Sequence, residues 1–337
     1  MQALDLSVTA RLPDGPVVKR HHRPLPLRVG TRASPLALTQ TRAFLHLLTR
    51  FCPVLRGMEA FQEHAISTTG DQVQDRRLAE IGGKGLFAKE IHEALLDRRI
   101  DLAVHSLKDL DTVLPPGIVI GCVLTREDAR DALILGQDCP EPDPADPYAS
   151  LPQRALIGTS SVRRQSQLLH ARPDLRVTLL RGNVLSRLNK IRAGHCDASL
   201  LALAGMRRLG LEAEASVALD PDLMVPSAGQ GIVGVTVRES DGELRQLLSA
   251  IEDSESAVVA AAERGMLAVL DGSCRTPIGG YARVLADSRM TLTGLVARED
   301  GSFLLKRSLA GLASDALAIG EELGASLRAD SPADVFT

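Results

Sequence analysis

The sequence predicts an α/β protein with two units in which strands alternate with helices, followed by a smaller α+β domain. Its 337 residues exceed the usual size of one domain, and a hydrophobic share of 45% is enough for ordinary buried cores. Between residues 27 and 203, short apolar strands alternate with helical stretches of about ten to fifteen residues, which is typical of βαβ units. From about residue 250, strands are instead grouped between two helices.

The first unit begins with a strand and a helix joined at Ser34-Pro35. Serine is a good N-cap and proline suits the first helical position. The polar, glycine-bearing stretch Gln72–Gly85 is a candidate loop. The expected strands are Leu27–Thr31, Ala65–Thr68 and Asp101–Ser106, and the expected helices are Pro35–Arg50 and Gly85–Arg99.

The second unit repeats this alternation after a proline-rich loop, Pro140–Pro147. Its expected strands are Arg154–Gly158, Val177–Leu180 and Asp197–Leu203, and its helices are Val162–His170 and Val184–Ala193. We therefore expect two parallel-type sheets.

The last part of the chain has a different order of elements. The expected helices are Glu255–Leu270 and Ser314–Arg328, and the strands between them are Tyr281–Leu285, Met290–Ala297 and Ser302–Leu309. This grouping indicates a small α+β domain.

Composition excludes several classes of partner and site. A net charge of −3, 2% aromatic residues and no tryptophan argue against nucleic acid or an anionic membrane as the partner. The five cysteines are far apart and form no CxxC, so neither a disulfide framework nor a metal site is expected. The expected location is therefore a reducing cytoplasm. Residues 1–26 lack the apolar core of a signal peptide and are expected to form a poorly ordered extension.

Arginine outnumbers lysine 33 to six, which leaves two explanations open. Genomic base composition alone could produce the imbalance. Alternatively, arginine forks could bind a substrate rich in carboxylates.

Polar or basic residues stand where several expected strands give way to helices. Free N–H groups at helix N-termini bind anions, and ligands of α/β sheets lie at the carboxyl ends of strands. Capping and solvated arginines are the alternative at any single position, whereas several such positions together favour an anion-binding cleft. The residues are Arg32, Ser34, Thr159, Ser160, Ser161, Arg163, Arg164, Arg181 and Asn183.

Two further places could carry chemistry. Lys108-Asp109 follows a buried strand and could be a structural ion pair, a carboxylate that stabilises a cationic intermediate, or a Schiff-base lysine. Cys274 lies in a glycine-flanked loop beside Arg275, where it could be a small buried hydrophobe or a reactive thiolate.

Two motif matches do not qualify. Gly229–Gly234 spells GxGxxG but leads into a β-rich run instead of a helix, so it is not a dinucleotide fingerprint. Gly82–Gly85 lacks the spacing and the hydroxyl residue of a phosphate-binding loop.

Taken together, the motifs resemble those of the porphobilinogen deaminase family from about Leu27 to Tyr281. They are GTRASPLA at 30–37, GGKGLFAKE at 82–90, VHSLKD at 104–109, Arg130-Asp131, GTSSVRRQ at 158–165, LRGNV at 180–184, AGMRRLGL at 204–211, PSAGQG at 226–231 and GSCRTPIGGY at 272–281.

The resemblance implies a fold of two periplasmic-binding-protein-like α/β domains plus a small C-terminal domain that carries the cofactor cysteine. The implied boundaries are 1–26 for the extension, 27–128 with 231–249 for domain 1, 129–230 for domain 2 and 250–337 for domain 3. Movement between the domains is expected as the bound chain lengthens. A cytoplasmic monomer without nucleic-acid or membrane partners is implied.

The implied activity is that of a transferase of tetrapyrrole biosynthesis. A dipyrromethane cofactor would be attached to Cys274 by a thioether. Four porphobilinogen molecules would be added to it head-to-tail, each with loss of ammonia, and hydroxymethylbilane would be released by hydrolysis.

The resemblance also implies residue roles. Asp109, with Lys108, would be catalytic, stabilising the cation left when ammonia departs. The acetate and propionate groups of the pyrroles would be held by Arg32, Ser34, Lys84, Ser106, Thr159, Ser160, Ser161, Arg163, Arg164, Arg181, Arg187, Arg208 and Gln230. Phe87 matches the region near the growing chain.

One residue departs from the family pattern. Asp111 stands two residues after Asp109, where the family usually has proline. A second carboxylate there could raise the pKa of Asp109 or loosen the loop, and neither follows if it faces solvent.

Two rivals remain. A non-catalytic anion-binding protein would explain the arginines but not Cys274, and a pyridoxal phosphate enzyme would use Lys108. The mass of the purified protein separates the first rival, and an imine absorption band would reveal the second.

Overall fold

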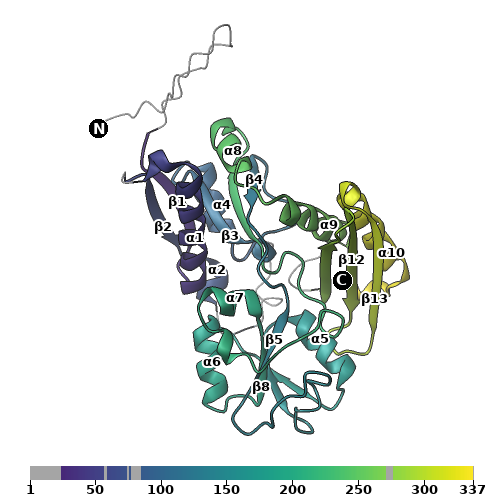
Figure 1. The fold of residues 1–337 in the computed structure, drawn as a ribbon. Helices are drawn as coiled ribbons and strands as arrows, with labels where there is room; N and C mark the ends of the chain where they lie inside the picture. The colour runs from purple at the N-terminus through teal and green to yellow at the C-terminus, as the bar shows by residue number, and fades with distance from the viewer. Residues whose placement is uncertain (1–23, 57–58, 74–75, 77–84, 271–275, 337) are drawn as a thin grey trace.

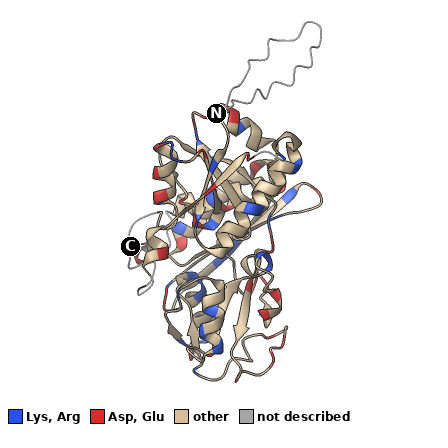
Figure 2. Cartoon of the chain, turned by 90° about the vertical axis from the view of Figure 1, so that its left-hand side faces the viewer, with Lys and Arg blue, Asp and Glu red and all other residues tan. Residues whose placement is uncertain are grey.

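The computed structural model describes residues 24–56, 59–73, 76, 85–270 and 276–336. They form two lobes, one above the other, with a third unit beside them (Figures 1 and 2). We call the part around the first sheet lobe 1, the part around the second sheet lobe 2, and the C-terminal part the C-terminal unit.

Lobe 1 contains a five-stranded sheet in the order β2-β1-β3-β10-β4. The strands are β1 (Leu27–Arg32), β2 (Phe61–Ile66), β3 (Leu102–Ser106), β4 (Ile118–Val123) and β10 (Val233–Arg238). Strands β2, β1 and β3 are parallel, whereas β10 runs antiparallel to both of its neighbours.

Helices cover both faces of this sheet. Phe44 and Leu48 of α1 pack with Leu244 and Leu248 of α8 on one face, and Ile91 and Leu95 of α4 pack on the other. The helical elements of lobe 1 are α1 (Pro35–Phe51), η1 (Pro53–Leu55), α2 (Thr69–Gln72), α4 (Lys89–Leu96), η2 (Leu107–Asp109) and α8 (Gly242–Ser249).

Lobe 2 repeats the arrangement with the order β7-β6-β8-β5-β9, in which β5 is the antiparallel strand. The strands are β5 (Asp131–Leu135), β6 (Leu156–Gly158), β7 (Arg176–Thr178), β8 (Ala198–Ala202) and β9 (Val217–Ala218). The helical elements are α5 (Val162–Ala171), α6 (Val184–Arg192), α7 (Leu203–Arg208) and η3 (Glu212–Glu214).

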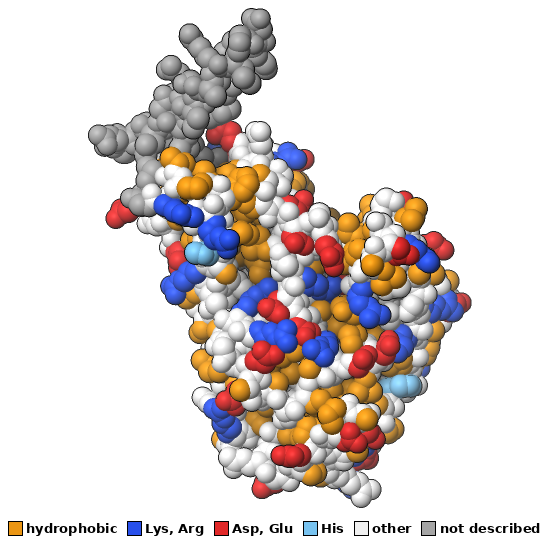
Figure 3. Space-filling view, viewed as in Figure 1, with side chains coloured by type: hydrophobic (Ala, Val, Ile, Leu, Met, Phe, Trp, Pro, Cys, Tyr) orange, Lys and Arg blue, Asp and Glu red, His pale blue; other side chains and the backbone are white. Residues whose placement is uncertain are grey.

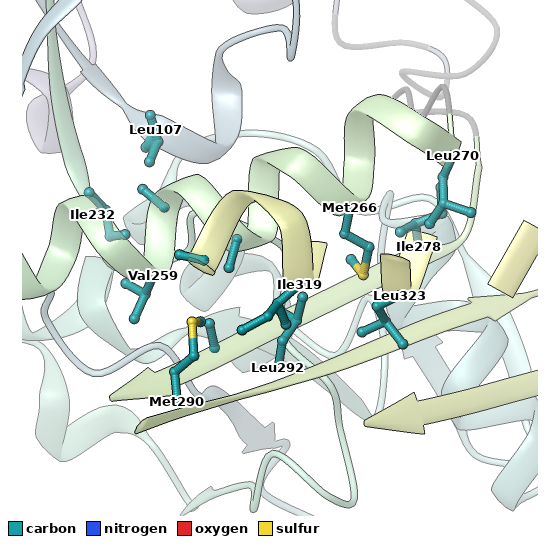
Figure 4. Packing of buried hydrophobic residues seen from close by; sticks show 14 of the residues in the cluster. Leu107, Ile232, Val259, Met266, Leu270, Ile278, Met290, Leu292, Ile319 and Leu323 are labelled. Atoms are coloured by element: carbon teal, nitrogen blue, oxygen red, sulfur yellow. The ribbon is translucent and has the colours of Figure 1, made fainter. Parts of the chain in front are cut away.

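The C-terminal unit is an antiparallel sheet of β11 (Ile278–Val284), β12 (Arg289–Ala297) and β13 (Leu304–Leu312), covered by two long helices. The helices are α9 (Ser254–Leu270) and α10 (Ala316–Asp330), with short turns η4 (Ala313–Asp315) and η5 (Ala333–Phe336). Met266 and Leu323 meet between helices and sheet in a core that also includes Leu107 and Ile232 of lobe 1 (Figure 4). This shared core joins the C-terminal unit to lobe 1.

The chain crosses between the lobes twice, from β4 into β5 and from β9 back into β10. The two crossing segments are hydrogen-bonded, since the Glu127 amide donates to the Gly231 carbonyl at 3.1 Å. Gly231 has φ +89°, and a Cβ there would lie 2.2 Å from the Glu127 carbonyl oxygen. Only glycine allows this close approach.

The α/β class with a C-terminal α+β unit is confirmed, and several details of the sequence prediction are wrong. The sheets are mixed, because each receives one antiparallel strand from a crossing segment. The second strand lies at Phe61–Ile66 instead of Ala65–Thr68, and the helix expected at Gly85–Arg99 covers only Lys89–Leu96. Strands β4, β5 and β9 and helices α7 and α8 were not predicted.

Candidate functional site

The candidate site lies where the carboxyl ends of the parallel strands of both lobes face each other. Arg32 ends β1, Asp109 follows β3, and Ser161 and Arg181 follow β6 and β7. Figure 3 shows Lys and Arg side chains, interspersed with Asp and Glu, across the middle of the molecule. Ligands of α/β sheets bind at such strand ends.

Asp109 and Arg32 form an ion pair in lobe 1. Arg32 Nη1 donates to Asp109 Oδ2 at 2.9 Å, and Arg32 also donates to both carboxylate oxygens of Asp71. The Phe87 ring lies 4.1 Å from the Arg32 guanidinium carbon. Although burial opposes it, the hydrogen bonds to Asp71 and Asp109 raise the pKa of Arg32. Arg32 is thus held between two carboxylates, and Asp71 is a residue that sequence reasoning missed.

Lys108 points toward the crossing segments. Its Nζ donates to Gln230 Oε1 at 3.0 Å, and Gln230 in turn donates to the Ala129 carbonyl and to Asp131 Oδ1. Burial, together with nearby Arg164, lowers the pKa of Lys108 to about 8. Gln230 therefore links the turn that carries Asp109 to lobe 2.

Arg163 and Arg164 share one buried carboxylate in lobe 2. Each donates to Asp131 at 2.7 Å, and each also donates to a backbone carbonyl, of Val225 and Leu200 respectively. Although burial opposes it, Arg163 and Arg164 hold the pKa of Asp131 well below its usual range. The Nη1 and Nη2 atoms of both arginines already have partners within the protein, and the prediction that these arginines bind substrate carboxylates stays a prediction. Arg164 Nε is buried with no hydrogen-bond partner.

Sequence analysis named Asp131 as part of a matching motif and gave it no role in the site. The one sequence signal was a charged residue at the start of an otherwise apolar strand, Asp131–Leu135. A carboxylate in that position needs a cation when it is buried.

Arg181 reaches from lobe 2 to lobe 1. Its Nη2 donates to the carbonyls of Gly70 and Val73 at 2.8 and 3.0 Å, while its Nη1 is buried without a hydrogen-bond partner. Burial and the proximity of Arg32 lower the pKa of Arg181. Among the described residues, Arg181 therefore has one buried N–H group whose hydrogen bond is not made.

Arg187 and Arg208 also donate hydrogen bonds to backbone carbonyls in this region. Arg187 Nε donates to the Gly182 carbonyl at 2.9 Å, and Arg208 Nη2 donates to the Gly231 carbonyl at 2.6 Å. Burial, with Arg164 and Arg181 nearby, lowers the pKa of Arg187 to about 10. Burial also lowers the pKa of Arg208.

Most of the predicted hydroxyl residues accept hydrogen bonds from nearby backbone amides. Ser34 and Ser161 cap α1 and α5, accepting hydrogen bonds from the Ala37 and Arg164 amides. Thr159 accepts from the Ser161 amide, and Ser106 bonds Gln40. Within the described part of the chain the Ser160 side chain makes no hydrogen bond, and the proposed ligand roles of these residues stay predictions.

Two predicted site residues, Lys84 and Cys274, lie outside the described residues. Within the described ranges there is no group of His, Cys, Asp and Glu suited to a metal ion. No helix in those ranges is long and apolar enough to span a bilayer.

Comparison with known proteins gives consistent matches over most of the chain. The family model described as "Porphobilinogen deaminase, dipyromethane cofactor binding domain" matches residues 27–246, and "Porphobilinogen deaminase, C-terminal domain" matches 257–329. Relatives named porphobilinogen deaminase include that of Paracoccus denitrificans, 46% identical over 92% of this chain and 96% of its own. That of Syntrophotalea carbinolica is 45% identical over 90% and 92%. The chloroplastic enzyme of Oryza sativa is 44% identical over 85% and 78%.

Among solved structures, the matches are more distant. The periplasmic domain of BvgS from B. pertussis is 14% identical, with a TM-score of 0.37 over 74% of this chain and 44% of its own. An ancestral cationic amino acid solute-binding protein is 13% identical, with a TM-score of 0.40 over 67% and 87%. With TM-scores below 0.5, nothing further follows from these two.

Proposed function

The chain belongs to the porphobilinogen deaminase family, and we propose that the residues between its two lobes are the site where porphobilinogen is condensed. The enzyme is a transferase that joins porphobilinogen molecules head-to-tail with loss of ammonia. The residue roles below are our proposals.

A surplus of clustered, buried and partly buried positive charge carries the proposal. Among the described residues, six cations lie within electrostatic reach of one another, against three carboxylates, which leaves a formal excess of three positive charges in that part of the chain. The cations are Arg32, Lys108, Arg163, Arg164, Arg181 and Arg187, and the carboxylates are Asp71, Asp109 and Asp131. Clustered, desolvated cations repel one another, and an anionic ligand would relieve that repulsion.

The residues present fit a dipyrromethane cofactor, which carries two carboxylates on each pyrrole ring. Arg181 Nη1 and Arg164 Nε are buried donors without hydrogen-bond partners, as expected where ligand carboxylates are to be received. We propose that these arginines, with Arg187 and Arg208, hold the carboxylates, and that Cys274 supplies the thioether. When bound, the group supplies a permanent tether and the pyrrole carbon to which the first new unit is joined.

We propose that Asp109 stabilises the cation that porphobilinogen becomes when ammonia leaves. Its Oδ2 is held by Arg32 at 2.9 Å, and its side chain remains 23% exposed, so the carboxylate can still face a ligand. Because Arg32 is also paired with Asp71, this three-residue cluster keeps a net negative charge. A preorganised negative charge stabilises a developing cation more strongly in a desolvated site than in water.

Lys108 would supply a positive charge to the substrate carboxylates. Gln230 accepts one of its three N–H donors, which fixes the direction of the ammonium group. A pKa of about 8 leaves most of the Lys108 side chain charged at neutral pH. The charged Lys108 side chain can therefore pair with a substrate carboxylate at neutral pH.

Other features of the enzyme are proposals of the same kind. We propose a cytoplasmic monomer with no nucleic-acid partner, and the domain boundaries given above: 27–128 with 231–249, 129–230 and 250–337. The sheet order supports these boundaries, because residues 233–238 add a strand to the lobe 1 sheet and residues 131–135 add one to the lobe 2 sheet.

The intact mass of the purified protein tests the proposal. The wild-type chain should weigh two pyrrole units more than its sequence, and Cys274→Ser should lose both this adduct and the turnover of porphobilinogen. Cys139→Ser, at a partly buried thiol, is the matched control and should keep both. An active protein without adduct would refute the role of Cys274. A protein that binds anions without turnover would favour the binding-protein rival.

A further inference from the structure

Asp111, the residue that departs from the family pattern, contacts a different element of lobe 1. Its Oδ1 accepts a hydrogen bond from the Gly85 amide at 2.9 Å, although the two residues are 26 apart in sequence. The carboxylate is therefore not simply solvated beside Asp109.

Gly85 is suited to this contact by its conformation. Its φ is +75°, and a Cβ at this position would lie 3.0 Å from Asp111 Oδ2. Glycine adopts this backbone readily and leaves room for the carboxylate. The close approach therefore depends on both residues.

The contact precedes a helix that lacks its own cap. The Gly85 carbonyl accepts from the Ala88 and Lys89 amides at 2.8 Å each, which forms the turn leading into α4. The N-cap residue Ala88 makes no side-chain cap hydrogen bond. A carboxylate next to such a turn satisfies an amide and interacts favourably with the positive end of the helix dipole.

That turn carries Phe87, which contacts Arg32 of the Arg32–Asp109 ion pair. The Phe87 ring is 4.1 Å from the Arg32 guanidinium carbon, and Arg32 donates to Asp109 at 2.9 Å. The neighbouring Leu86 carbonyl accepts from the Gly70 amide at 2.8 Å. A shift of the turn would therefore move Phe87 relative to Arg32.

The backbone of Asp111 is itself fixed from the C-terminal unit. Arg264 of α9 donates through Nη2 to the carbonyls of Asp111 and Thr112, at 2.8 Å each. Arg264 is half-buried, and burial lowers its pKa. The loop that carries the Asp111 carboxylate is thus held in place by a helix packed in the shared core.

We propose that Asp111 is a positioning residue, which fixes the Gly85–Ala88 turn and through it the Phe87–Arg32–Asp109 arrangement. This rests on the proposed function for its catalytic consequence, although the contact itself can be tested without turnover. Asp111 acts through other residues and does not touch the reacting atoms in this proposal.

Two substitutions separate the hydrogen bond from the charge. Asp111→Ala removes the acceptor and should lower kcat about five- to tenfold, with KM within about twofold. Asp111→Asn keeps an acceptor oxygen and should stay within about twofold of wild-type kcat. Asp97→Ala is the matched control, because Asp97 lies at the other end of α4 and is largely exposed. It should change neither constant.

Hydrogen–deuterium exchange of the full-length protein supplies a readout independent of activity. Asp111→Ala should speed exchange in a peptide spanning 85–96 while the rest of the chain and the Tm stay close to wild type. Three outcomes overturn the proposal: wild-type exchange and kcat in Asp111→Ala, an equal loss in Asp111→Asn, or faster exchange throughout with a lowered Tm. If the wild-type protein turns over no porphobilinogen, the proposed function fails, while local exchange still decides whether Asp111 holds the turn.

Discussion

Replacing Asp131 with asparagine should strongly destabilise lobe 2. The carboxylate is fully buried and accepts from Arg163, Arg164 and Gln230 at 2.7 to 2.9 Å. Asparagine has nearly the same shape but no charge. Its NH₂ group would also point hydrogen-bond donors at the donating N–H groups of the two arginines and the glutamine. Two buried guanidinium groups would then lack their counter-ion.

The expected magnitude follows from the burial of Asp131 and of its two charged partners. Arg163 and Arg164 are only 5% and 6% exposed. Removing one member of a buried ion pair typically costs about 3–5 kcal/mol, since the other charge stays desolvated. With an unfolding entropy of about 2.1 cal/mol/K per residue, 1 kcal/mol shifts the Tm of a 337-residue chain by about 1.4 °C, so the expected fall is roughly 4–7 °C.

Thermal unfolding followed by circular dichroism measures this change, and urea unfolding provides a second probe. The control is Asp334→Asn, because Asp334 pairs with Arg298 on the surface and such exposed pairs contribute little. It should leave the Tm unchanged. An Asp131→Asn protein that melts within about 1 °C of wild type would refute the reasoning, since the two arginines would then have found other partners.

The pH dependence gives an independent check on the same residue. Although burial opposes it, Arg163 and Arg164 hold the pKa of Asp131 well below its usual range. A depressed carboxylate pKa contributes stability above the unfolded-state pKa of about 4, and that stability is lost as pH falls below this value toward the folded pKa. The stability gap between wild type and Asp131→Asn should therefore be constant from about pH 5 to 7 and narrow below about pH 4.

Three further predictions concern the site. Asp109→Asn should keep the mass adduct while kcat falls about 10²–10⁴-fold in a porphobilinogen-consumption assay, and near-normal turnover would remove Asp109 from the mechanism. Because burial and nearby Arg164 lower the pKa of Lys108 to about 8, its charge is lost above that pH, so KM should rise through about pH 8. Lys108→Arg should abolish the rise, and a wild-type KM that stays flat to about pH 9 would contradict this role. Arg181→Leu should raise KM about tenfold or more in steady-state kinetics, whereas Arg192→Leu on the exposed face of α6 should not; equal effects would exclude a specific role for Arg181.

Local patterns were sufficient for most elements of lobe 1 and lobe 2. The Ser34-Pro35 signal predicted the start of α1, and Ser34 does accept a hydrogen bond from the Ala37 amide. Segments with weak or mixed hydrophobic patterns were harder to predict. Strand β2 alternates polar and apolar residues over Phe61–Ile66 and was displaced by about three residues in the prediction.

The antiparallel strands could not be predicted from the alternation of strands and helices along the sequence. Strands β5 and β10 enter each sheet from the crossing segments, so their pairing partners are far away in sequence. Sequence periodicity reports which face of a strand is buried, but it does not report which strand lies beside it.

By itself, the sequence determined the fold class and the family and predicted a set of site residues, because motifs and periodicity are local properties of the chain. Tertiary structure alone decided how those residues are paired. It placed Asp71 on Arg32, Asp131 between Arg163 and Arg164, and Asp111 on Gly85. Each pair joins residues at least 26 positions apart, and the energy of such contacts depends on distance and burial that only the folded chain creates.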